Sequence, residues 1–185
     1  MNFTIYTTEN APKRSKSLLK SAKKSNGFLP NILGVMAESP AVLEGYLKLS
    51  KIVSRSDFSP QEKELAILAV SEENKCEYCT AVHSTALKKQ LNADEGIVNA
   101  VFKGEELANP KLNILVNYVR KAVRSRGHVQ EEDIQEFLKA GYSKQNVLEI
   151  NLIIALMTIS NYTNHLADTP LDEVYKSEKI ELESA

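Results

Sequence analysis

The sequence predicts an all-α protein. Its 185 residues include only 7 glycines, 6 prolines and no tryptophan, which leaves few turn residues for an all-β fold. Apolar residues recur at helical spacing along almost the whole chain, and the only segment that suggests strand alternation is 3–6. Hydrophobic residues make up 43% of the chain and charged residues 25%, as in an ordinary globular protein, which disfavours disorder as the main state.

The first half of the chain predicts four helices. A basic helix ends at Gly27, a short helix covers 31–38, and a third opens at Pro40. The fourth begins at 59–62, where serine offers an N-cap, proline the first helical residue and glutamate the third position of a capping box. We expect it to end near Asn74 and Lys75, since asparagine tolerates the left-handed conformation that often follows a helix.

The second half predicts five further helices. They are expected over 76–90, after a cap at Asn92, and over 112–123, 130–138 and 143–166. The last is apolar on nearly all sides, which is typical of a helix buried between others. Its apolar residues between Leu152 and Ile159 are interpreted as core or subunit interface and not as a cofactor site, which fits an oligomer.

The length and the net charge of the chain limit the number of domains and the kinds of partner that we expect. We expect one domain over 1–170, with an N-terminal arm and basic helix in 1–27, and a polar C-terminal tail over 171–185. The net charge of −1 gives no general reason to bind nucleic acid or an anionic membrane. The most apolar stretch, 147–159, contains a glutamate and is shorter than the roughly 20 residues of a membrane span. Because the start lacks a secretory signal, we expect a cytoplasmic protein.

One spacing occurs twice in the chain. The residues that share it are Glu64, Cys76 and Cys79 in the first set and, 85 residues further on, Glu149, Asn161 and Asn164 in the second. A helix-start serine precedes each set. The echo is compatible with a degenerate internal duplication whose second copy has lost its cysteines.

Two cysteines three residues apart form the candidate site. In a reducing compartment such a pair is not a disulfide framework. On a helix that begins near Cys76, the side chains of Cys79 and His83 lie on the same face. The free N–H groups of a helix start favour a thiolate at Cys76, whereas a neighbouring imidazole, which titrates near neutral pH, favours Cys79.

Glu64 is the second part of that candidate site. It borders the apolar face of the preceding helix, where burial of an unpaired carboxylate is costly. Since the next helix begins after a tight turn, His83 is a suitable partner, and a carboxylate, an imidazole and a thiol have the layout of an activated nucleophile. The alternative is that Glu64 is an ordinary surface residue of an amphipathic helix.

The pattern E-x11-C-x2-C-x3-H, formed by Glu64, Cys76, Cys79 and His83, resembles the AhpD-like superfamily. That group contains alkylhydroperoxidase AhpD and proteins of the carboxymuconolactone decarboxylase family. The run from Ser59 to Glu64 before the cysteines is similar to the peroxidase-related branch, as is the segment 161–165. The resemblance covers about residues 28–170, and its specific part is confined to 59–90.

The resemblance implies an all-α trimer or hexamer that reduces hydroperoxides with thiols, in antioxidant defence. It implies that Glu64 and His83 relay a proton from Cys79 and that Cys76 is the disulfide partner. Attack on the peroxide would give a sulfenic acid, then a disulfide that a dithiol or a protein thiol reduces, and no bound cofactor is needed. Where some members carry a second histidine, this chain has Tyr78, a poor base at neutral pH.

Three alternatives remain open. Cys76, Cys79 and His83 could be zinc ligands, but a structural zinc usually has four, and the other histidines are His128 in a loop and His165 at a helix end. The same dithiol could serve a redox sensor or a disulfide-exchange protein without turnover. A lactone decarboxylase is suggested by the family name alone, since a dithiol has no obvious role in decarboxylation.

Overall fold

Helices supply all the regular secondary structure in residues 3–179, the part of the chain that the computed structural model describes. The all-α prediction is confirmed, and residues 3–6 form no strand. The α-helices are α1 (Lys13–Asn26), α2 (Asn31–Met36), α3 (Pro40–Val53), α4 (Pro60–Glu73), α5 (Glu77–Thr85), α6 (Glu95–Lys103), α7 (Pro110–Arg124), α8 (Glu131–Lys139) and α9 (Lys144–Ala167). A π-helical turn, Ala86–Gln90, continues α5, and a 3-10 helix, Glu173–Glu178, follows α9.

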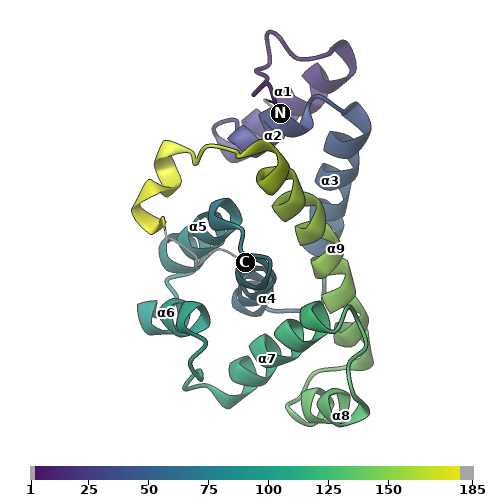
Figure 1. Ribbon diagram of the computed structural model, residues 1–185, viewed down its shortest axis with the longest axis vertical. Coiled ribbons are helices and arrows are strands. Elements are labelled where there is room, and N and C mark those ends of the chain that lie inside the picture. Colours follow the sequence, from purple (N-terminus) through teal and green to yellow (C-terminus); the bar gives the residue numbers. More distant parts are fainter. Residues whose placement is uncertain (1–2, 180–185) are drawn as a thin grey trace.

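Helix α4 lies at the centre of the molecule (Figure 1). Every residue from 65 to 72 is buried, because α5, α7 and α9 pack around the helix. The sequence pattern predicted a one-sided apolar stripe, but small residues such as Ala66 and Ala69 let neighbours approach on the other sides as well. Both helices that carry the candidate site, α4 and α5, therefore rest on the core.

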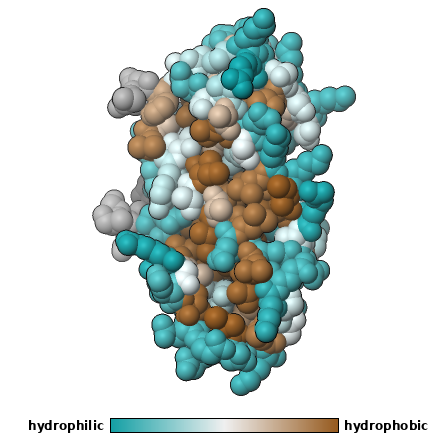
Figure 2. Space-filling model, turned by 90° about the vertical axis from the view of Figure 1, so that its right-hand side faces the viewer, coloured by the Kyte–Doolittle hydropathy of each residue, from teal (hydrophilic) through white to brown (hydrophobic). Residues whose placement is uncertain are grey.

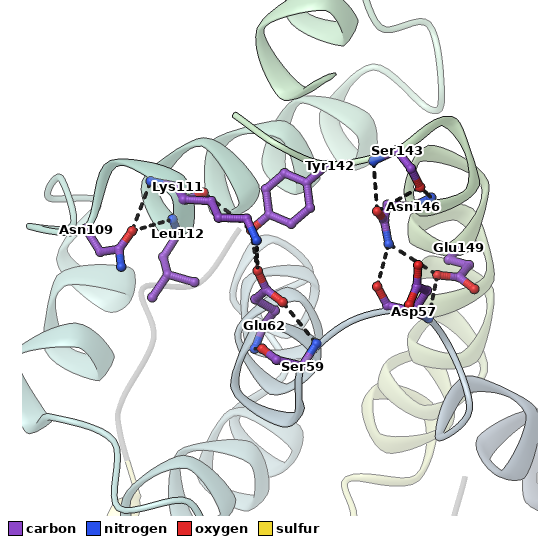
Figure 3. Close-up of polar contacts among 10 residues, drawn as sticks. All are labelled: Asp57, Ser59, Glu62, Asn109, Lys111, Leu112, Tyr142, Ser143, Asn146 and Glu149. Atoms are coloured by element: carbon purple, nitrogen blue, oxygen red, sulfur yellow. Dashed lines mark hydrogen bonds and ion pairs between the residues drawn. The ribbon is translucent and has the colours of Figure 1, made fainter. Parts of the chain in front are cut away.

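Polar contacts fix the starts of three helices against one another (Figure 3). The predicted capping box is confirmed, since Ser59 and Glu62 exchange hydrogen bonds between side chain and backbone. The other carboxylate oxygen of Glu62 accepts a hydrogen bond from Tyr142 at 3.1 Å and pairs with Lys111 at 2.8 Å. The start of α4 is thus tied to α7 and to the loop before α9.

Helix α9 has a capping box of its own, formed by Ser143 and Asn146. The Asn146 amide also donates to the Asp57 carbonyl at 2.7 Å, and Glu149 accepts from the Asp57 backbone at 2.8 Å. These bonds join the start of α9 to the chain just after α3 (Figure 3). The two helices consequently run antiparallel and in contact.

The predicted end of α4 near Asn74 and Lys75 is confirmed, whereas the predicted cap of α6 at Asn92 is wrong. The left-handed residue after α4 is Lys75, with φ of 56°, while Asn74 stays right-handed and its amide donates to Asn161 at 2.9 Å. The cap of α6 is Asp94, and Asn92 instead adopts the left-handed conformation with φ of 50°. Asparagine suits both roles, so only its tertiary partners decide which one it takes.

The segment assigned to a polar tail begins with ordered structure. Residues 173–178 form the 3-10 helix and pack against α5, while 180–185 lie outside the described residues. The repeated spacing has no matching local structure, because its first set spans the break between α4 and α5 and its second set lies on the single helix α9. Among residues 3–179, no helix is long and apolar enough to cross a membrane.

Candidate functional site

A tight turn brings the first residue of the site beside the end of α4. The backbone N–H of Cys76 donates to the Ser71 carbonyl at 2.9 Å, and the left-handed Lys75 reverses the chain direction. Cys76 is the N-cap of α5 and Cys79 lies in its first turn. The two side chains are therefore held together at the N-terminus of a helix, as the spacing predicted.

Both cysteines are free thiols inside the protein. Only 1% of Cys76 and 2% of Cys79 is exposed. The Asn164 amide of α9 donates to the Cys79 sulfur at 3.2 Å and to the Cys76 sulfur at 3.7 Å, and the Ser160 hydroxyl lies 3.1 Å from the Cys79 sulfur. The buried side of α9 thus presents polar groups to both sulfurs, although the buried side of a helix usually carries apolar side chains.

These contacts shift the pKa values of the two thiols in opposite directions. A hydrogen bond from Cys79, helped by Asn164 and opposed by burial, lowers the pKa of Cys76 to about 6. Burial, together with the neighbouring Cys76 sulfur, raises the pKa of Cys79 well above its ordinary value. At neutral pH Cys76 is therefore a thiolate that accepts a hydrogen bond from the Cys79 thiol, which keeps its proton.

The predicted contact between Glu64 and His83 is present. The His83 imidazole Nδ1 lies 2.8 Å from a carboxylate oxygen of Glu64, and the exposed fractions of the two side chains are 18% and 24%. The alternative of a freely solvated Glu64 is thereby excluded. Because the carboxylate engages Nδ1, the other ring nitrogen, Nε2, is left for a reacting group.

The His83 imidazole and the Cys79 sulfur line the same cavity, but no hydrogen bond joins them. Among the described residues, the side-chain hydrogen bonds of Cys79 run to α9 and to its partner cysteine, and none runs to His83. Cys79 and His83 nevertheless line one cavity of about 300 Å³, together with Tyr46 and Ser160. Cys76 is not part of its wall. A small molecule in this cavity would reach the Cys79 sulfur first.

Tyr46 of α3 links the two halves of the site, a role that the sequence did not reveal. Burial of its hydroxyl, together with the nearby Cys79 and Glu64, raises the pKa of Tyr46, and hydrogen bonding with Ser160 acts in the opposite direction. Its hydroxyl thus lies within electrostatic range of both the sulfur and the carboxylate. In the sequence, Tyr46 is one of several apolar residues on a helical stripe, and nothing distinguishes it.

Tyr78 takes a role that differs from that of a second base. Its hydroxyl donates to Asp172 at 2.5 Å, and Asp172 also accepts from the backbone N–H of Asn31. Burial and the carboxylate of Asp172 raise the pKa of Tyr78. The bond ties the segment after α9 to α5, and Tyr175 from that segment forms part of the cavity wall.

The three cysteine and histidine residues proposed as zinc ligands do not converge. Within residues 3–179, no group of three or more histidine, cysteine, aspartate or glutamate side chains has a geometry that could hold a metal ion. The other two histidines, His128 and His165, lie at exposed positions. His165 stacks against Tyr162, with ring centroids 6.4 Å apart.

Comparisons with known proteins agree with this arrangement. The model of the carboxymuconolactone decarboxylase family matches residues 40–113, which include Glu64, both cysteines and His83. No curated protein matches the sequence.

Three solved structures share the fold. The AhpD-core, peroxidase-related protein of Ralstonia eutropha JMP134 is 16% identical, with a TM-score of 0.82, and the match covers 97% of each chain. A peroxidase-related protein of Silicibacter sp. TM1040 is 19% identical, with a TM-score of 0.77 over 90% of this chain and 88% of that one. The debrominase Bmp8, in complex with 2,3,4-tribromopyrrole, is 21% identical, with a TM-score of 0.78 over 96% and 95% of the two chains.

At these identities the structural matches concern the fold, and the family match concerns the segment that carries the dithiol. Residues 40–113 are thus similar to the carboxymuconolactone decarboxylase family, and the described chain shares its fold with the solved AhpD-core and peroxidase-related structures.

Proposed function

We propose that the protein is a thiol-dependent hydroperoxide reductase with a role in antioxidant defence. The observation that carries the proposal is that Cys79 and His83 line one cavity while Glu64 orients the imidazole. A nucleophile, a base and an orienting acid thus surround a space that a small substrate can fill. The peroxidase-related proteins that share the fold support the same chemistry.

The first step takes place at Cys79. Its sulfur attacks the terminal peroxide oxygen, a sulfur–oxygen bond forms, and the oxygen–oxygen bond breaks. The thiol proton moves to the Cys76 thiolate, and His83 delivers a proton to the departing alkoxide, which leaves as an alcohol. Cys79 is now a sulfenic acid. The hydroxyls of Ser160 and Tyr46 offer a path for protons between sulfur and imidazole.

The second step closes the disulfide. Cys76 attacks the Cys79 sulfur and its proton leaves with the hydroxide as water, so that two electrons have passed from the dithiol to the peroxide. A dithiol then reduces the Cys76–Cys79 disulfide by exchange. Because both sulfurs are buried, we infer that a small dithiol which enters the cavity suits this step better than direct contact with a protein surface.

The cavity indicates a neutral and largely apolar substrate. Its described wall contains neither lysine nor arginine, and it is built mainly from apolar side chains and tyrosine rings. Apart from His83, which is paired with Glu64, nothing in this wall would compensate a carboxylate on the substrate. A volume of about 300 Å³ lies at the lower end of the range for small-molecule sites, which favours compact organic hydroperoxides.

Consumption of cumene hydroperoxide in the presence of dithiothreitol tests the proposal. Cys79→Ser and Cys76→Ser should each abolish turnover. Glu64→Gln, which leaves His83 without its orienting carboxylate, should slow it by about 10²-fold, the lower end of what general acid–base catalysis contributes. Glu77→Gln, which removes the same charge from an exposed position in α5, is the matched control and should leave the rate unchanged. Full activity in both cysteine variants would refute the mechanism.

The same assay separates the enzyme from a redox sensor. A sensor or disulfide-exchange protein would use the same two sulfurs but would react only once for each reduced chain. Repeated turnover with excess dithiothreitol supports the reductase. A single burst that ends at one peroxide per chain supports the sensor.

A further inference from the structure

A second cavity, of about 360 Å³, lies between α6 and α7 beside the end of α4. It shares no residue with the cavity that Cys79 and His83 line. Hydrophobic residues gather on the side of the molecule formed by α3 and α9 (Figure 2), whereas α6 lies on the other side (Figure 1). We call this space the α6–α7 cavity, and its polar wall consists of Glu72, Lys103, Asn117, Arg120, Lys121 and Arg124.

The spacing of residues in α7 explains why one wall of the α6–α7 cavity is basic. Four polar residues follow one another in steps of three, one and three, so that they share one face of the helix: Asn117, Arg120, Lys121 and Arg124. The opposite face of α7 packs against α4 and fixes the position of this wall. Helix α6 contributes Lys103, its last residue, and ends there because Gly104 is left-handed, with φ of 67°.

The charges at the α6–α7 cavity leave an excess of cations. Three close ion pairs engage the carboxylates of the wall and its rim, namely Glu72–Lys75 at 3.1 Å, Glu73–Arg124 at 2.6 Å and Asp133–Lys121. Arg120 and Lys103 lie outside these close pairs, so five cations meet three carboxylates. Glu105 and Glu106 follow α6, but both are exposed and neither forms a described ion pair.

Arg120 is the buried cation of the cavity wall, and the protein leaves most of its donors unused. Only 9% of its side chain is exposed. A guanidinium has five N–H donors, of which one on Nη2 bonds the Val101 carbonyl, while Nε is buried without a hydrogen-bond partner. The carboxylates of Glu72 and Glu73 approach only to 3.6 Å, which is beyond hydrogen-bond distance. Since unmade hydrogen bonds of a buried charge are costly, this site lacks an anionic acceptor.

We propose that the α6–α7 cavity binds a phosphate group, either free or carried by a small metabolite. A phosphate dianion balances the two excess cations and accepts hydrogen bonds from Arg120 and Lys103. Its tetrahedral oxygens can face α6 and α7 at once, whereas a planar carboxylate matches a single arginine fork. Phe102, also in the wall, provides an apolar surface for the rest of a metabolite. The site goes beyond the redox proposal and does not depend on it.

Calorimetric titration of the full chain with inorganic phosphate and with glucose 6-phosphate tests the proposal. At least one of the two should bind with one site per chain, and unphosphorylated glucose should not bind. The tighter of the two phosphates identifies whether the natural ligand is a phosphorylated metabolite or the free ion, and either result supports the site. Succinate, a dicarboxylate, should bind more weakly. Binding of neither phosphate, or tighter binding of succinate, overturns the proposal.

Substitutions in the wall test where the phosphate binds. Arg120→Lys keeps the charge but loses the planar fork, and it should weaken phosphate binding by about tenfold or more. Lys103→Gln, at an exposed position, should weaken it about two- to fivefold. Lys24→Gln, which removes one exposed cation from α1, is the matched control and should leave the affinity unchanged.

Circular dichroism verifies that each of these variants is folded. If Arg120→Lys does not fold, Lys103→Gln decides the outcome, because its side chain makes no described hydrogen bond or ion pair that folding could require. An affinity for phosphate that is unchanged in Lys103→Gln, or that falls equally in Lys24→Gln, would contradict binding in the α6–α7 cavity.

Discussion

The two faces of α9 both differ from those of an ordinary amphipathic helix. Its inner face places the polar side chains of Ser160, Asn161 and Asn164 in the protein interior, and its outer face exposes Leu148 and Leu166 to solvent. The inner residues are polar because they contact two sulfurs, of which one is a thiolate.

Substitutions on the two faces of α9 should differ most in how far they lower the free energy of unfolding. Ile153 is fully buried on the inner side of α9, and Ile153→Ala should lower the free energy of unfolding by about 2–5 kcal/mol through lost burial and a cavity. Leu166→Ala, at 72% exposure, should cost less than about 0.5 kcal/mol in the monomer. Urea denaturation of both variants measures the difference. Equal losses would mean that the outer face packs within one chain.

The inner face should also control the acidity of the dithiol. Asn164→Ala removes a hydrogen bond to the thiolate, worth about 1.5–3 kcal/mol for a charged group, so the pKa of Cys76 should rise by about 1–2 units from about 6. Alkylation rates as a function of pH measure the shift. Asn151→Ala, at an exposed position of the same helix, is the control and should leave the pKa unchanged. An unchanged pKa in Asn164→Ala would show that α9 does not tune the thiols.

The pH dependence of stability should show a smaller effect. The pKa of Cys76 is lowered in the folded protein from its ordinary value of 9.0 to about 6. The thiolate therefore stabilises the fold fully above pH 9 and loses this contribution as the pH falls through 6. The raised pKa of Cys79 opposes it only at higher pH, because an unfolded thiol ionises there.

Stability measured from pH 6 to pH 9 should consequently rise in the wild type. Cys76→Ser should remove that rise, because serine does not ionise in this range. Cys79→Ala is the companion variant, and it should weaken the rise by removing the hydrogen bond to the thiolate. A flat wild-type profile would contradict an acidic Cys76.

The sequence predicted the local parts of this structure well. The capping box of Ser59 and Glu62 and the contact between Glu64 and His83 follow from spacing and from the cost of an unpaired carboxylate. The all-α class follows from the helical period of the apolar residues. Each of these inferences concerns residues fewer than 20 positions apart, where helix geometry determines which side chains share a face.

The remaining contacts depend on tertiary packing. Asn164 contacts Cys79 across 85 positions and Tyr78 contacts Asp172 across 94, and no local period encodes such distances. The repeated spacing drew attention to Asn161 and Asn164 as a second copy of the site. The structure instead brings Asn164 to the cysteines themselves. The role of Tyr46 was equally hidden, since an aromatic residue on a helical stripe is typical of a core.

Single-turnover oxidation of the reduced protein tests the central claim most directly. Equimolar cumene hydroperoxide should be consumed completely, and mass spectrometry should find that each chain has lost two hydrogen atoms through a bond between Cys76 and Cys79. Glu64→Gln should form the same disulfide more slowly. Peroxide that remains unreacted, or cysteines that end as separate oxidised acids without a disulfide, would contradict the proposed cooperation of the dithiol with the Glu64–His83 pair.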